Sequence, residues 1–100
     1  MTEDDRARLA AAEQQLRSAS SAADAARAGF VATMRDILPR WRAELGVTQA
    51  ALARRMGVDP ATTSRIESGH LTQPGLCLQA VDAMWSLERE RASADLAVVP

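Results

Sequence analysis

The sequence predicts an all-α protein. Hydrophobic residues make up 47% of the 100 residues, yet the chain has only one Phe, two Trp and no Tyr. The core must therefore consist mainly of Ala, Leu, Val and Met, which suits packed helices better than a β-sandwich. Apolar residues also recur at helical spacing, and capping residues precede several of these segments. We expect one compact domain with five helices, the first of which is an N-terminal helical arm.

The arm is predicted over residues 1–28. Thr2 is followed by three acidic residues, a pattern that starts a helix because a hydroxyl caps free N–H groups and carboxylates favour the positive end of the helix dipole. An apolar or small residue then returns every seven positions, at Leu9, Leu16, Ala23, Phe30 and Ile37. This alanine-rich seam suits the close approach of another helix, either from a second copy or from the same chain. A solvated, partly frayed helix that breaks at Gly29 is the alternative.

The second predicted helix runs from about Phe30 to Leu45 and opens a domain that spans residues 29–91. Its apolar residues recur on one face, at Phe30, Met34, Ile37, Leu38, Trp41 and Leu45. Pro39 removes a helical hydrogen bond, so the helix is expected to be kinked or to begin afresh near residue 38. Gly46 then ends it.

Two short helices follow, joined by a glycine turn. Thr48 caps the first, which is expected to reach about Met56. Asp59 caps the second and places Pro60 at the first helical position, where its missing N–H costs nothing. We expect this second helix to end at Gly69.

The last helix is predicted from Pro74 to about Arg91, and it is apolar nearly all round. Such a helix needs neighbours on several sides, so we expect it to pack against the arm, a second subunit, or both. Residues 92–100 are expected to form a flexible tail. The residues assigned to a dimer or partner interface are Leu9, Leu16, Ala23, Val81, Met84 and Trp85.

Neither a catalytic site nor a metal site can be assembled from these residues. Cys77 is the one cysteine and is expected to be a small buried residue, and His70 is the one histidine, expected to be a loop residue or a phosphate contact. We therefore expect no enzyme activity, no cofactor and no metal. No apolar run approaches the roughly 18 residues of a membrane span, and the acidic N-terminus is unlike a signal peptide, so a cytoplasmic location is expected.

The net charge of −1 conceals an uneven distribution. Residues 29–73 hold six Arg against four acidic residues, whereas residues 74–100 hold two Arg against four. All twelve basic residues are arginine, a side chain that suits bidentate contact with phosphate or guanine, although a biased genome composition gives the same result.

The middle of the chain carries a known pattern. Its parts are Thr48-Gln49, Leu52-Ala53, Met56-Gly57-Val58, Ser64-Arg65-Ile66-Glu67, Gly69 and Pro74. With these motifs, residues 34–87 resemble the phage repressor and Cro-like helix-turn-helix family, also called the xenobiotic-response-element type. The resemblance implies that the second short helix enters the major groove of double-stranded DNA while the first crosses the backbone.

The resemblance also implies roles for individual residues. Gln49 would donate to a phosphate, assisted by Thr48. The outward positions of the recognition helix would be Pro60, Ala61, Thr62, Ser64, Arg65 and Ser68. Among these, Arg65 alone can make a bidentate contact with guanine. Arg42 and Glu67 occupy the positions of a partly buried ion pair that many family members form.

Two departures from the family pattern carry expectations of their own. Thr63 stands where an aliphatic residue usually fills the core, so its hydroxyl is expected either to bond back to the previous turn or to loosen the helix. The loop of residues 70–73 has no Lys or Arg to bind phosphate. A single copy would then bind weakly, and we expect two copies on a palindrome with half-sites about one helical turn apart.

These observations together predict a sequence-specific DNA-binding transcriptional regulator. We expect a homodimeric repressor that binds a palindromic operator with residues 59–68 in the major groove. The alternative is a protein-interaction module, such as the antitoxin of a toxin–antitoxin pair or an adaptor, in which the arm or the last helix binds a partner protein. The low positive charge and the apolar last helix support this alternative.

Overall fold

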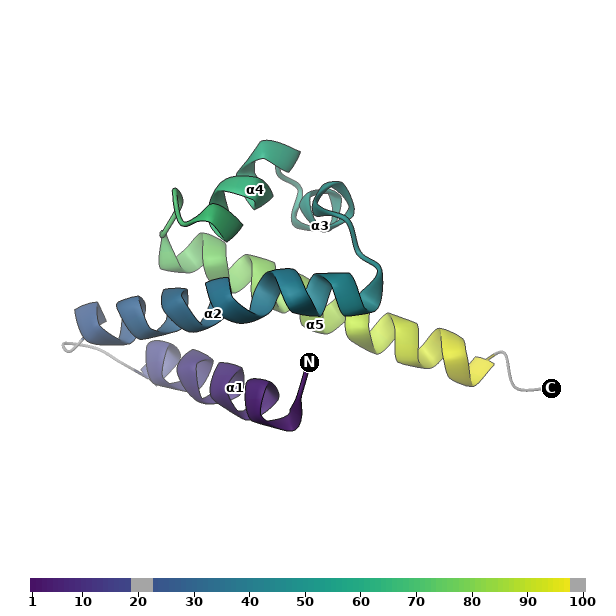
Figure 1. Ribbon diagram of the computed structural model, residues 1–100, viewed down its shortest axis with the longest axis horizontal. Helices are drawn as coiled ribbons and strands as arrows, with labels where there is room; N and C mark the ends of the chain where they lie inside the picture. Colours follow the sequence, from purple (N-terminus) through teal and green to yellow (C-terminus); the bar gives the residue numbers. More distant parts are fainter. Residues whose placement is uncertain (19–22, 98–100) are drawn as a thin grey trace.

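The structure, a computed structural model, describes residues 1–18 and 23–97. Over these residues it contains five helices and no strand, which confirms the all-α prediction. The helices are α1 (Glu3–Ser18), α2 (Ala23–Leu45), α3 (Gln49–Met56), α4 (Pro60–Ser68) and α5 (Pro74–Ala97). The long helix α2 is central: α1 lies along one side of it, α3 and α4 lie on the other, and α5 crosses behind it (Figure 1). None of the described helices is long and apolar enough to cross a membrane.

The helix α2 is longer than predicted. It begins at Ala23, passes through Gly29 and Pro39, and is followed by Gly46 at a φ of 68°. The alternative break at Gly29 and the new start near residue 38 are therefore wrong. The kink at Pro39 stays a prediction. A glycine costs a helix only about 1 kcal/mol, and burial of the apolar face of α2 offsets that cost. The helix α2 spans the predicted boundary between residues 28 and 29. The division into an arm and a domain stays a prediction.

The core lies between α2 and α5. Its largest fully buried side chains include Trp41, Phe30, Leu9, Met34 and Ile37. The rings of Trp41 and Trp85 meet edge to face, with their centroids 4.4 Å apart and an interplanar angle of 62°, a favourable aromatic geometry. Cys77 is fully buried, which confirms its predicted role, and this burial raises the pKa of its thiol.

The N-terminal helix α1 packs on its own chain. Leu9 enters the core with 1% of its surface exposed. The Arg6 guanidinium binds Glu88 of α5 through two hydrogen bonds of 2.7 and 2.9 Å and lies 5.6 Å from the ring centre of Trp85. Its proximity lowers the pKa of Glu88. The indole Nε1 of Trp85 in turn donates to Glu13 at 3.0 Å. Of the two predicted positions for the arm, the one along its own domain is therefore observed.

This packing covers several of the residues assigned to a dimer or partner interface, a role that stays a prediction. Leu9, Val81 and Met84 are buried in the chain's own core, so they offer no surface to a second copy or a partner. Leu16 and Trp85 are partly buried against the same core. The side chain of Ala23 lies outside the described residues.

The end of α5 is also longer than predicted. The helix reaches Ala97, so residues 92–97 are helical, while residues 98–100 lie outside the described residues. The flexible tail at residues 92–100 stays a prediction. Arg55 of α3 binds Glu90 at 2.6 Å, and Arg91 donates to the carbonyl of Leu45 at the end of α2. These contacts connect the second half of α5 to the body of the protein, which helps the helix to continue.

Candidate nucleic-acid interface

The α3–turn–α4 unit is built from local capping chemistry. The hydroxyl of Thr48 accepts a hydrogen bond from the Ala51 N–H at 3.0 Å, and the carboxylate of Asp59 accepts one from the Ala61 N–H at 2.9 Å. Gly57 and Gly69 end the two helices at φ values of 73° and 86°. Glycine adopts this left-handed backbone without steric cost. The predicted caps and ends of both helices are confirmed.

Buried residues hold α3 and α4 together. Leu52, Ala53 and Ile66 are fully buried, and the small side chain of Ala53 lets the two helices cross closely. Thr63 is also buried, and its hydroxyl lies 2.8 Å from the Pro60 carbonyl and 3.1 Å from the Gln49 carbonyl. The predicted bond to the previous turn is therefore formed. The same hydroxyl also lies at the start of α3, so it joins the two helices.

The Arg42–Glu67 ion pair fixes α4 to the body of the protein. Arg42 donates from Nε and Nη2 to the two carboxylate oxygens of Glu67 at 2.7 and 3.0 Å. Its Nη1 donates to the Val47 carbonyl at 2.9 Å, and the Gln49 amide donates to Glu67 at 3.0 Å. The side chains of Arg42 and Glu67 are only 18% and 8% exposed. The carboxylate raises the pKa of Arg42. One network thus joins α2, the loop after it, α3 and α4.

The residues predicted to contact phosphate lie at the start of α3. Thr48 is exposed, and its hydroxyl proton remains able to donate because the oxygen acts as the acceptor in the cap. Gln49 is half-buried with its amide turned toward Glu67. A primary amide has a second N–H, so the phosphate contact of Gln49 stays a prediction.

The outward face of α4 is mostly exposed. Five of its predicted DNA-contacting residues are exposed and Thr62 is half-buried; the exposed ones are Pro60, Ala61, Ser64, Arg65 and Ser68. Arg65 is the one basic residue in this helix. The Ser68 hydroxyl donates to the Arg65 carbonyl at 3.2 Å and lies 2.7 Å from Nδ1 of His70. Ser68 is therefore directed toward the following loop.

One arginine near this face was not predicted. Arg35 of α2 is exposed, and its Nη2 lies 3.4 Å from the Ser68 carbonyl at the end of α4. A Cβ atom on Gly69 would overlap the Arg35 guanidinium, so the glycine is what allows this close approach. Arg35 lies two helical turns before Arg42, a spacing that places both on one face of α2. That spacing is the signal that could have identified it.

Within residues 1–18 and 23–97, no three His, Cys, Asp or Glu side chains are grouped so that they could hold a metal ion.

Comparison with known proteins agrees with this geometry. Residues 34–84 match the family model of the helix-turn-helix domain, which is consistent with the resemblance to phage repressors and Cro-like proteins. Neither the curated proteins nor the solved structures include a significant match to the chain. The matched segment covers half of the chain and contains all of α3, the turn and α4. The chain therefore belongs to the helix-turn-helix domain family and is a DNA-binding protein.

Proposed function

We propose that the protein is a homodimeric transcriptional repressor that binds a palindromic operator with residues 59–68 in the major groove. The observation that carries this proposal is the exposed face of α4 with Arg65 on it, presented by a helix that the Arg42–Glu67 pair holds in place. A recognition helix that is already held in position in the free protein loses little conformational entropy when it binds DNA. On this proposal the protein acts in the cytoplasm and has neither enzyme activity nor a cofactor.

The side chains on α4 suggest how a base sequence is read. Arg65 can donate two hydrogen bonds to O6 and N7 of guanine. Pro60 and Ala61 can pack on a thymine methyl group or on sugar, whereas Thr62 and Ser64 can reach a phosphate or a base edge. With one strong base contact in each copy, specificity also depends on the shape and deformability of the DNA.

A second copy is proposed because one domain offers few phosphate contacts. Two copies on a palindrome double both the base contacts and the phosphate contacts. Three of the residues assigned to the interface, Leu9 of α1 and Val81 and Met84 of α5, are covered by the chain itself, so the proposed contact between copies uses another surface. We assign it to the end of α5, which projects beyond the other helices (Figure 1).

The alternative, a protein-interaction module, has less support from the structure than from the sequence. Its two arguments were the low positive charge and an apolar last helix available to a partner. The charge argument remains, since the chain has a net charge of −1. The second argument weakens, because Val81, Met84 and Cys77 of α5 are buried within the chain.

The test is binding to the DNA upstream of the protein's own gene, measured across a salt series. We expect a steep loss of affinity with salt and a dimer by sedimentation. Arg65→Ala should lose about 1–3 kcal/mol of discrimination between this DNA and an unrelated duplex, the usual contribution of a bidentate base contact. Absent or sequence-independent binding by the parent protein would contradict the proposal. Arg17→Ala, which removes an exposed arginine from α1, is the matched control.

A further inference from the structure

The loop that follows the recognition helix has no basic residue of its own except His70. Residues 71–73 are Leu, Thr and Gln, so this loop offers no arginine or lysine to the DNA backbone. Arg35 of α2 lies beside this loop and supplies a positive charge there. Its guanidinium contacts Ser68 and Gly69, the last residue of α4 and its C-cap.

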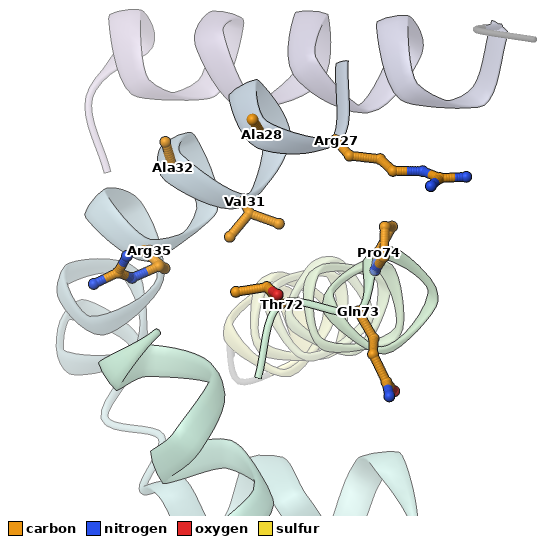
Figure 2. Close-up of a pocket in the computed structure, with 8 residues that line it drawn as sticks. All are labelled: Arg27, Ala28, Val31, Ala32, Arg35, Thr72, Gln73 and Pro74. Atoms are coloured by element: carbon orange, nitrogen blue, oxygen red, sulfur yellow. The ribbon is translucent and has the colours of Figure 1, made fainter. Parts of the chain in front are cut away.

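A cleft of about 590 Å³ lies between α2 and this loop, and Figure 2 shows the residues that line it. Val31 lies at its centre opposite Thr72. Arg35 lies toward the α4 end of the cleft, whereas the guanidinium of Arg27 extends past Pro74 at the opposite end (Figure 2). The cleft therefore has an arginine near each end and an apolar middle.

We propose that this cleft is a binding site for the phosphate backbone of DNA, with Arg35 as its main contact and Arg27 as the second. The inference rests on the proposed DNA-binding function and adds a contact surface outside α3 and α4. When α4 lies in the major groove, the chain segments at its ends come close to the flanking phosphates. Arg35 is at one such end.

The chemistry of Arg35 fits a phosphate. A guanidinium has five N–H donors in a planar fork that matches phosphate geometry. The bond to the Ser68 carbonyl is long at 3.4 Å, and the side chain is exposed. The remaining donors can therefore bind an anion while Arg35 keeps its position against Gly69.

The spacing of the two arginines fits a DNA strand. Arg27 and Arg35 are eight positions apart on α2, which corresponds to about 12 Å along the helix axis at ~1.5 Å per residue. One phosphate group is much smaller than this separation, so the two side chains would bind different phosphates of the backbone. The first turn of α5, which borders the cleft, carries no acidic residue that would repel the phosphates.

The test compares two DNA duplexes of equal length, one from upstream of the protein's own gene and one unrelated, over a salt series. Arg35→Gln should weaken binding to both by the same factor. It should also reduce the slope of log affinity against log salt by about 1 per copy, because one phosphate contact is lost. Arg35→Lys, which keeps the cation, should retain the slope. Arg27→Gln combined with Arg35→Gln should reduce the slope further.

Two controls separate this site from the base-reading face and from general charge effects. Arg65→Ala should lower the preference for the upstream duplex, whereas Arg35→Gln should leave that preference unchanged. Arg17→Ala removes the same charge from α1, which lies on the side of α2 opposite α3 and α4 (Figure 1), and should change neither quantity. Thermal unfolding of each variant shows that the fold is intact.

The outcomes distinguish this site from the function on which it rests. An unchanged slope in Arg35→Gln, beside specific binding by the parent protein, would overturn the backbone site alone. A change in sequence preference without a change in slope would do the same. If the parent protein binds neither duplex, both the proposed function and this site are wrong.

Discussion

Removing one member of the Arg42–Glu67 pair should destabilise the fold and loosen α4. Breaking a buried ion pair on one side costs about 3–5 kcal/mol, because the other charge remains buried without its partner. Here Arg42 is 18% exposed, so water partly compensates for the loss of Glu67. Glu67 is only 8% exposed and would keep only the Gln49 amide if Arg42 were removed. The larger cost is therefore expected for Arg42→Ala.

The expected magnitude follows from these contacts. Arg42→Ala removes three hydrogen bonds, two of them to the Glu67 carboxylate. We expect a loss of about 2–3 kcal/mol in the free energy of unfolding, and about 1–2 kcal/mol for Glu67→Ala. The double variant should cost less than the sum of the two, with a coupling energy of about 1–2 kcal/mol.

The assay is equilibrium unfolding in urea followed by tryptophan fluorescence. Trp41 is fully buried and Trp85 partly buried, so both report on loss of the core. Linear extrapolation gives the free energy in water. Arg54→Ala is the matched control, because Arg54 is an exposed arginine of α3, and it should stay within about 0.5 kcal/mol of the parent protein.

The reasoning would be refuted by an Arg42→Ala variant as stable as Arg54→Ala. It would also be refuted by strictly additive losses in the double variant, since additivity is the behaviour of residues that do not interact. If the pair does position the recognition helix, Arg42→Ala should weaken binding to the upstream DNA under conditions in which the variant is still folded.

Two further predictions concern α1. Leu9→Ala leaves a cavity in the core and should cost about 2–4 kcal/mol with a single cooperative urea transition; a second transition, or no loss of stability, would mean that α1 is not part of the folding unit. The pKa of Asp5 is lowered, mainly by hydrogen bonds from Arg40. Ionised Asp5 therefore stabilises the fold above its unfolded pKa of about 3.9. This stabilisation is lost as the pH falls through the lower pKa of the folded state. Asp5→Asn should therefore lower the thermal midpoint at neutral pH and have little effect near pH 2, whereas a difference that does not depend on pH would contradict the ion pair.

The sequence predicts the α3–α4 unit well because its signals are local. The Thr48 hydroxyl and the Asp59 carboxylate each cap the first turn of a helix, and a glycine ends each helix. All of these interactions lie within one turn of the chain. The Arg42–Glu67 pair was predicted only through the resemblance to a family. The contact of Arg35 with Gly69 was missed, since it arises where α2 passes the end of α4, and no local rule describes that crossing.

Predictions for α2 were wrong because they rested on single residues. Gly29 and Pro39 both weaken a helix in isolation, so each predicts a break, a kink or a new start. The apolar face of α2 is buried at Phe30, Met34 and Ile37, and tertiary packing of such a face contributes more than the local cost. Propensity therefore gave the wrong bounds even though the apolar periodicity identified the correct face.

The partner of the alanine-rich seam could not be predicted, because a heptad pattern does not encode which helix it meets. Leu9 is the one large side chain of α1 that is fully buried, and its burial is worth only about 1.5–3 kcal/mol. Ala12 and Leu16 add partly buried area beside Leu9, and polar contacts to α5 supplement this packing. The Arg6–Glu88 and Trp85–Glu13 bonds have this role, and each joins residues far apart in the sequence. Their geometry is satisfied within one chain, which explains why the arm lies on its own domain.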